Sequence, residues 1–121
     1  MVFGTFDGIL EQHLKLFESA REKGDYLIVV IARDENVKKI RGEWPQLSEG
    51  KRQKLVQRQK DVSRAVLGYK RNKLKIIKEL RPDIVCLDYA QKIDLNELKE
   101  GLSDMKVVPQ IIRLKEIKDN E

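Results

Sequence analysis

The sequence predicts an α/β fold: a Rossmann-like, three-layer domain with a mainly parallel five-stranded sheet, formed by residues 1–121 as a single domain. Strand-like and helix-like segments alternate along the whole chain, which is the order that builds a parallel sheet covered by helices. Residues 26–32 form a continuous, largely β-branched apolar run, typical of a strand buried on both faces. Ser48 and Asp94 stand where helix caps are expected.

The first half of the chain contains two strand-like segments separated by a helix. An apolar run over residues 2–6 predicts the first strand, and apolar residues then recur at helical spacing from Leu10 to Ala20. After the buried run at 26–32 comes a short polar helix or turn over 33–37. Ser48 is expected to cap a helix from Glu49 to about Lys60.

The second half repeats this alternation. Residues 65–67 are a brief strand candidate, and Asn72 is expected to cap a helix that ends before Pro82. Residues 84–87 predict another buried strand. Asp94, with Glu97 three residues later, resembles a capping box, and residues 107–112 predict a last strand whose Pro109 places it at an edge of the sheet.

Composition excludes several classes of protein. Hydrophobic residues make up 40% and charged residues 37% of the 121, so the chain has enough apolar material for a core beneath an ionic surface. The longest apolar run, residues 27–32, is far shorter than the roughly 20 residues of a membrane span, and a cytoplasmic protein without a membrane partner is expected. Cys86 is the only cysteine, which excludes an internal disulfide.

The net charge of +5 is spread among interleaved acidic and basic residues. A small anion such as a nucleotide accounts for the surplus, and no nucleic acid partner is expected because neither an aromatic stacking platform nor a helix-turn-helix pattern is recognisable. A steep salt dependence of oligonucleotide binding would revive the nucleic-acid interpretation.

Ligands of open parallel sheets bind beyond the carboxyl ends of the strands. Three segments fall at such ends: residues 4–8 after the first strand, residues 33–34 after the second, and residues 88–91 after the strand at 84–87. In the first of them, small residues allow backbone amides to approach a phosphate ahead of a helix N-terminus. We expect the three segments to converge on one site.

The sequence Gly4-Thr5-Phe6-Asp7, followed by a helix that carries His13, resembles the Gly-Thr-Phe-Asp and His-x-Gly-His signature of the cytidylyltransferase-like nucleotidyltransferase superfamily. The similarity continues in order through residues 37–42, 65–68 and 81–87. Among its members, the chain is most similar to archaeal-type FAD synthases and glycerol-3-phosphate cytidylyltransferases. The resemblance implies transfer of AMP, or CMP, from ATP or CTP to a phosphorylated small molecule such as FMN, with release of pyrophosphate, with Mg²⁺, and in a homodimer.

The resemblance also assigns roles to residues. It implies that His13 donates a hydrogen bond to the α-phosphate, and that Lys38 and Arg41 close over the triphosphate from the segment that contains them. The nucleotide-binding residues that it implies are Gly4, Thr5, Phe6, Asp7, Gln12, His13, Arg33, Asp88 and Gln91. No protein ligands for a metal are assigned.

The chain departs from the signature at two positions, because Leu10 and Gln12 stand where the family has its first histidine and its glycine. Removing one donor to a transition state typically lowers the rate by about two to three orders of magnitude. The alternative function is therefore a catalytically impaired, nucleotide-binding descendant that acts in sensing or assembly. Structural interpretations also stay open: a core role for His13, a strand-end ion pair of Arg33 with Asp34, a solvated face for Lys38 and Arg41.

Overall fold

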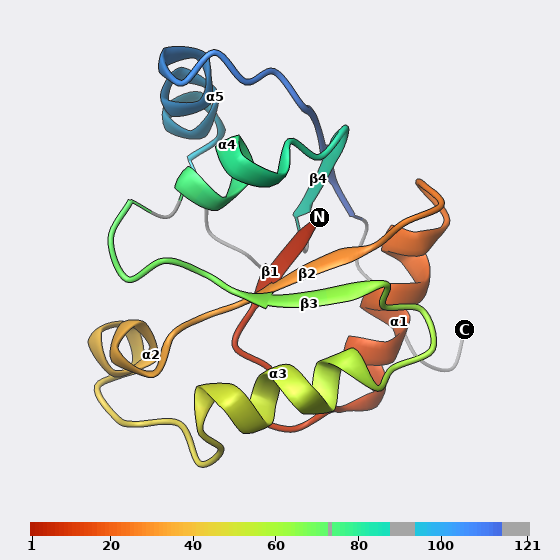
Figure 1. Cartoon of the computed structure of the whole chain (residues 1–121), viewed down its shortest axis with the longest axis vertical. Helices are drawn as coiled ribbons and strands as arrows, with labels where there is room; N and C mark the ends of the chain where they lie inside the picture. Colours follow the sequence, from red (N-terminus) through yellow and green to blue (C-terminus); the bar gives the residue numbers. More distant parts are fainter. Residues whose placement is uncertain (73, 88–93, 115–121) are drawn as a thin grey trace.

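The computed structural model describes residues 1–72, 74–87 and 94–114, and it shows the alternation of strands and helices that the sequence predicts (Figure 1). The strands are β1 (Val2–Gly4), β2 (Ile28–Ile31), β3 (Arg64–Leu67), β4 (Ile84–Leu87) and β5 (Gln110–Arg113). The helices are α1 (Glu11–Arg21), α2 (Asp34–Arg41), α3 (Glu49–Gln57), α4 (Lys75–Leu80) and α5 (Leu95–Asp104).

The strands form two sheets, so the prediction of one five-stranded sheet was wrong. One sheet has the order β1-β2-β3, the other pairs β4 with β5, and every pairing is parallel. The two sheets touch through Met1, whose amino group donates to the Ile84 carbonyl over 2.9 Å and whose carbonyl accepts from the Cys86 N–H over 2.9 Å. β1 and β4 also contact each other, but within residues 1–72, 74–87 and 94–114 no strand pairing joins the two sheets.

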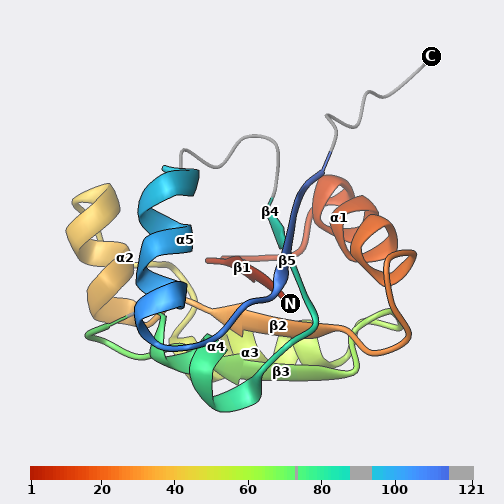
Figure 2. The same cartoon turned by 90° about the horizontal axis from the view of Figure 1, so that it is seen from above.

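The strands carry apolar side chains on both faces, which makes the middle layer of a three-layer fold. In β2, Val29 and Ile31 pack with α1 and α3 side chains, whereas Val30 packs with α4 and α5 side chains. β4 alternates in the same way, with Cys86 on the first face and Val85 and Leu87 on the second. Figures 1 and 2 show α4 and α5 on one side of the strands and α1 on the other.

Local capping signals were confirmed at two helices and wrong at a third. The Ser48 side chain accepts from the Lys51 N–H at α3, and Asp94 accepts from the N–H groups of Asn96 and Glu97 at α5. Asn72 is not a cap: its φ of 52° turns the chain, and Leu74 occupies the N-cap position of α4. α2 is longer than the sequence predicted and α3 is shorter.

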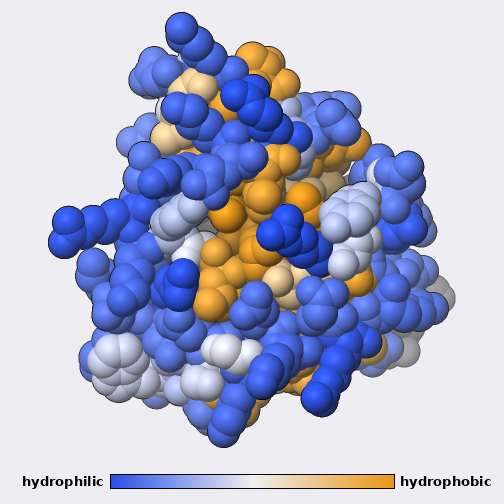
Figure 3. Space-filling view, in the orientation of Figure 1, coloured by the Kyte–Doolittle hydropathy of each residue, from blue (hydrophilic) through white to orange (hydrophobic). Residues whose placement is uncertain are grey.

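The last strand begins after Pro109 rather than including it, and β5 is the edge strand that the proline predicted. Because Pro109 lies outside β5, the strand contains no residue that lacks an N–H for pairing with β4. The surface seen in Figure 3 is polar around its periphery, with apolar side chains showing near its centre between α4 and β3. Among the described residues, every helix is too short or too polar to cross a bilayer.

Candidate functional site

The turn after β1 is shaped by the ring of Phe6. Phe6 has a φ of 54° and is buried, and its ring lies 5.2 Å from the His13 ring and 5.3 Å from the Phe17 ring, measured between centroids. A Cβ atom at Gly4 would lie 2.6 Å from the Phe6 ring, so any other residue at this position would force the ring to shift. Gly4 therefore has a packing role in this turn. The positive φ of Gly8, 108°, then leads the chain toward α1.

His13 lies in the first turn of α1 with one ring nitrogen already engaged. Its Nδ1 accepts a hydrogen bond from the Leu10 N–H over 3.0 Å. A neutral imidazole that accepts at Nδ1 carries its proton on Nε2, which makes Nε2 the donor. The geometry is therefore consistent with the donor role that the resemblance implies. Leu10 and Gln12 flank this position and are exposed.

Asp7 fastens the segment after α2 to the turn after β1. Its carboxylate accepts from the Gln46 N–H over 2.7 Å and from the Leu47 N–H over 2.8 Å. The Arg41 guanidinium lies 3.8 Å from the same carboxylate. These groups stabilise the ionised form, chiefly the Gln46 N–H, and they hold the pKa of Asp7 below its ordinary value. Asp7 thus brings Arg41 next to the predicted phosphate-binding turn.

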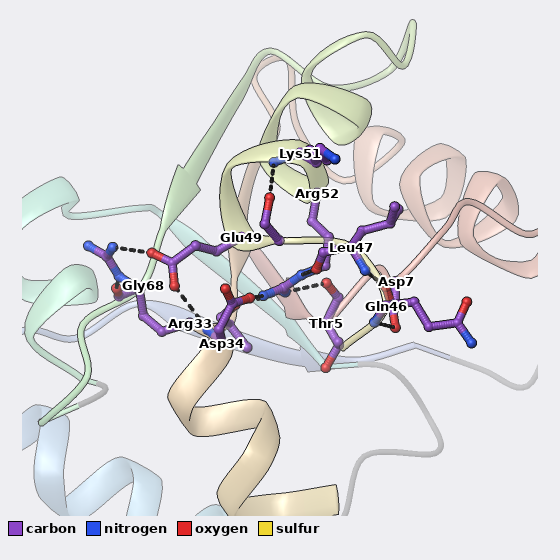
Figure 4. Close-up of polar contacts among 12 residues, drawn as sticks. Thr5, Asp7, Arg33, Asp34, Gln46, Leu47, Glu49, Lys51, Arg52 and Gly68 are labelled. Atoms are coloured by element: carbon purple, nitrogen blue, oxygen red, sulfur yellow. Dashed lines mark hydrogen bonds and ion pairs between the residues drawn. The ribbon is translucent and has the colours of Figure 1, made fainter. Parts of the chain in front are cut away.

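The centre of the site is Arg52, a residue to which the sequence analysis gave no role. Its side chain is fully buried. Nη1 donates to the carbonyls of Thr5 and Ala32 over 2.8 Å each, and Nε donates to the Leu47 carbonyl over 3.0 Å. Figure 4 shows this guanidinium between the ends of the first two strands and the segment before α3. Arginine is suited to such a place because its planar group offers five fixed donors.

A second ion pair extends the network toward β3. Nη1 of Arg33 lies 2.7 Å from Glu49, and its Nε donates to the Gly68 carbonyl over 2.7 Å (Figure 4). Glu49 also accepts from the Asp34 N–H over 3.0 Å, and this hydrogen bond is the main reason that its pKa lies below the ordinary value. Arg33 pairs with Glu49, while its neighbour Asp34 pairs with Arg52. The predicted Arg33–Asp34 pair is thus replaced by two longer-range pairs.

Two depressions open beside this network. The smaller has a volume of about 150 Å³ and is lined by Asp7, Arg41, Glu43, Trp44 and Gln46. The larger has a volume of about 650 Å³ and is lined by Arg33, Tyr69, Lys70, Arg71, Asn72 and Lys75. The exposed indole of Trp44 forms part of the first wall.

The predicted site residues are therefore only partly brought together. Asp7 and Arg41 meet beside the turn that contains Thr5 and Phe6, and His13 packs on the Phe6 ring. Lys38 is engaged at the end of its own helix, where its Nζ donates to the Gly42 carbonyl over 2.7 Å. Asp88 and Gln91 lie outside the described residues. Arg52 was missed, although its four-residue spacing to the buried Val56 placed it on the apolar face of a predicted helix.

Comparisons with known proteins agree with this architecture. The family model for cytidylyltransferase-like proteins matches residues 1–121. The FAD synthase of Aciduliprofundum boonei is 36% identical over 121 residues, which is all of this chain and 80% of that protein. The FAD synthase of Korarchaeum cryptofilum is 42% identical over 123 residues, covering 99% of this chain and 83% of that protein.

A solved structure gives the same result for the fold. The lipopolysaccharide core biosynthesis protein from Thermoplasma volcanium superposes with a TM-score of 0.92 at 32% identity, over 98% of this chain and 96% of that one. The chain belongs to the cytidylyltransferase-like family of nucleotidyltransferases.

Proposed function

We propose that this nucleotidyltransferase transfers AMP from ATP to the phosphate group of FMN and releases pyrophosphate. The observation that carries the proposal is the similarity to FAD synthases, at 36% to 42% identity over essentially the whole chain. Transfer of CMP from CTP is the second form of the same reaction. The acceptor phosphate is the nucleophile in both, so no general base is required.

In the proposed reaction an oxygen of the acceptor phosphate forms a bond to the α-phosphorus of the nucleotide. The bond from that phosphorus to the oxygen bridging to the β-phosphate breaks, and pyrophosphate leaves with the electron pair. Catalysis then depends on alignment and on stabilising charge as it develops. His13 Nε2–H is the proposed donor to the α-phosphate, and Arg41 the proposed cation near the triphosphate.

Binding of the nucleotide requires the turn of residues 4–8 to keep its shape. Arg52 holds the Thr5 carbonyl and Asp7 holds the backbone of residues 46 and 47, so the turn and the adjoining segment are fixed as one unit. We propose that backbone N–H groups of this unit, with the α1 N-terminus, face the phosphates. Gln12, Arg33, Asp88 and Gln91 remain proposed nucleotide contacts, as does Lys38 after a change of its hydrogen bond to Gly42.

We propose that Mg²⁺ enters with the triphosphate. The described residues contain no group of three or more His, Cys, Asp or Glu side chains arranged to hold a metal ion, and the Asp7 carboxylate already accepts two N–H groups. Mg²⁺ commonly keeps several waters and binds substrate phosphates rather than an all-protein cage, so the site fits that arrangement. When bound, the ion would neutralise charge on the phosphates.

The test is calorimetric titration with ATP and with CTP, each with Mg²⁺, followed by pyrophosphate release with FMN or glycerol 3-phosphate present. Turnover with ATP and FMN supports the proposal, and a preference for CTP or for glycerol 3-phosphate names the other nucleotide or acceptor. A His13→Ala variant should lower kcat about a hundredfold or more while nucleotide affinity changes less. Absence of binding of both nucleotides would contradict the proposal.

The second candidate is a nucleotide-binding protein with impaired catalysis, favoured by Leu10 and Gln12 in the signature positions. Binding of ATP without release of pyrophosphate from any acceptor would support it. We also propose a homodimer, because β3 is an edge strand of its sheet and apolar side chains show beside it (Figure 3). Light scattering would then give about twice the chain mass of 14.1 kDa.

A further inference from the structure

The outer face of α3 carries a row of cations. Its exposed basic residues are Lys51, Lys54 and Arg58, the last at the C-cap position. At about 3.6 residues per turn they lie within an arc of about 60° and span about 10 Å along the helix, on the side away from the buried Arg52 and Val56. The only carboxylate of α3, that of Glu49, is already bonded to Arg33. We call these three residues the basic stripe.

The outer face of α5 has the same pattern with the opposite sign. Its exposed acidic residues are Glu97, Glu100 and Asp104. They repeat the spacing of three and then four residues, and they lie on the side away from the buried Leu102. Lys99, the only basic residue of α5, lies on another side of the helix. We call these three residues the acidic stripe.

Neither stripe is neutralised within the molecule. Among residues 1–72, 74–87 and 94–114, none of the six side chains forms an ion pair. Like charges three and four residues apart on a helix repel each other. The helix dipole adds to this cost, because Lys51 lies in the first turn of α3 and Asp104 in the last turn of α5. α1 is different, since its Lys15 lies 3.8 Å from Glu11.

The two stripes lie on opposite sides of one molecule. Val56 of α3 packs in the apolar cluster that contains α1 side chains, whereas Leu102 of α5 packs in the cluster that contains α4 side chains. Figure 1 shows α3 near the lower edge and α5 near the upper edge. Because each stripe faces away from its own cluster, the two cannot meet within one chain. They can meet only between two copies, in a head-to-tail contact.

We propose that the basic stripe of one copy docks on the acidic stripe of a second copy of this chain. Charge complementarity identifies the partner, because equal numbers of opposite charges repeat with equal spacing and each cation meets one carboxylate. Exposed ion pairs are individually weak, so the contact is transient and sensitive to salt. A homodimer at the β3 edge would use the same surface of both copies, whereas this contact uses two different surfaces and continues from copy to copy. The inference goes beyond the proposed function and does not depend on the reaction.

The first test is sedimentation velocity of the full chain at rising protein concentration. In about 0.05 M salt the mean mass should rise above that of the species present at the lowest concentration, with a dissociation constant of about 0.1 to 1 mM. In about 0.5 M salt the rise should disappear, because the screening length falls to a few ångström. A mass that stays constant up to about 1 mM protein in low salt would overturn the inference.

Reversal of the charges tests the two stripes directly. The α3 variant, Lys51→Glu/Lys54→Glu/Arg58→Glu, and the α5 variant, Glu97→Lys/Glu100→Lys/Asp104→Lys, should each weaken association roughly tenfold or more, because both stripes then have the same sign. The sixfold variant that combines them keeps the net charge of +5 and again has opposite stripes, so it should associate within about threefold of the unmodified protein. Lys54→Glu/Glu100→Lys makes the same comparison for the central pair with only two substitutions. Circular dichroism checks that each variant is folded, and failure of both swapped variants to associate contradicts the inference.

A matched control separates the stripes from the net charge. Lys23→Glu/Lys39→Glu/Lys78→Glu changes the net charge as the α3 variant does, at exposed positions after α1, on α2 and on α4. It should associate at least as tightly as the unmodified protein. An equal loss in this control and in the α3 variant would overturn the inference. Loss in the α3 variant without loss in the α5 variant would assign the basic stripe to a different anionic partner and would overturn it as well.

Zero-length crosslinking locates the contact. A carbodiimide joins a lysine amine to a carboxylate where the two touch, and the crosslinked dimer is then digested and analysed by mass spectrometry. In low salt, α3 peptides that contain Lys51 or Lys54 should be linked to α5 peptides, and these links should disappear at about 0.5 M salt. Dimers linked only through other elements would contradict the assignment. None of these measurements uses turnover, so failure of the proposed reaction would leave their outcome unchanged.

Discussion

The Arg52 guanidinium donates from Nη2 to the Asp34 carboxylate over 2.6 Å, and this pair joins α3 to the start of α2. The Arg52 side chain is fully buried, whereas that of Asp34 is 29% exposed. Its Nη1 and Nε donate to three backbone carbonyls, of Thr5, Ala32 and Leu47. One side chain therefore determines the relative positions of the turn after β1, the end of β2 and the segment before α3.

Replacing Arg52 should destabilise the fold more than any other single charge change on α3. Arg52→Met leaves three carbonyls and a carboxylate without their donor, and we expect a loss of about 3 to 5 kcal/mol in the free energy of unfolding. Arg52→Lys should recover little, because an ammonium cannot reach four acceptors in the plane of a guanidinium. Urea denaturation measures both.

The control is Lys54→Met, an exposed lysine on the same helix. It should change stability by less than about 0.5 kcal/mol. Equal losses in Arg52→Met and Lys54→Met would show that the buried network contributes nothing to folding.

Asp7→Asn tests the fastening of residues 46 and 47. The variant places an amide N–H₂ against one of two N–H donors, and at neutral pH we expect a loss of about 1 to 2 kcal/mol in the free energy of unfolding. The pKa of Asp7 is held below its ordinary value in the folded protein, so its contribution is fully present above the ordinary range and is lost as pH falls through the folded value.

The difference in the free energy of unfolding between the unmodified protein and Asp7→Asn should therefore be largest near neutral pH and shrink below about pH 4. Unfolding by urea at a series of pH values measures it. Glu49 loses its contribution over the same acidic window in both proteins, because its pKa is also below its ordinary value, and the subtraction removes that term. A difference that stays constant down to pH 3 would contradict the assignment to Asp7.

Gly4→Ala tests the packing of Phe6 over the turn. The new Cβ would lie 2.6 and 2.7 Å from two ring atoms of Phe6, so we expect a destabilisation of about 1 to 3 kcal/mol. The loss should be smaller in a Phe6→Leu background, since the atoms that clash are then absent. A double-mutant cycle in urea measures this coupling.

Gly50→Ala is the matched control for the same chemical change. A Cβ at Gly50, in the first turn of α3, would meet nothing within 4 Å. Alanine is the better helix former, and the substitution should stabilise the protein by up to about 1 kcal/mol. Destabilisation by Gly50→Ala comparable with that of Gly4→Ala would remove the Phe6 ring as the cause.

Restoring the family signature tests why Leu10 and Gln12 are present. We expect Leu10→His together with Gln12→Gly to raise kcat for pyrophosphate release by about one to two orders of magnitude, because a second donor would face the transferred phosphate. Each single variant should gain less. The measurement is steady-state turnover with ATP and FMN, and no gain in the double variant would mean that position 10 does not face the nucleotide.

The sequence by itself determined the order and kind of the elements, because those depend on local chemistry. Continuous β-branched runs predicted buried parallel strands, and Ser48 and Asp94 capped α3 and α5 as expected. The Gly4 to Asp7 motif and His13, together with the ordered matches through residues 37–42, 65–68 and 81–87, indicated the family, which the comparisons confirmed. The prediction of Asn72 as a cap was wrong because its backbone is left-handed, a conformation that asparagine adopts readily in turns. The sequence alone does not distinguish an asparagine that caps a helix from one that forms a turn.

Only the tertiary structure decided how these elements combine into a site. Neither the division of the strands into two sheets nor the hydrogen bond from Met1 to Ile84 is recorded by any pattern within a strand. The sequence places Arg52 on the same helix face as Val56 but does not indicate its partners, which are 5 to 47 residues away along the chain. Asp7 likewise contacts residues 46 and 47 across 39 and 40 positions. Hydrogen bonds over such separations exist only once the chain is folded, because folding first brings the groups together and excludes the water that would compete for them.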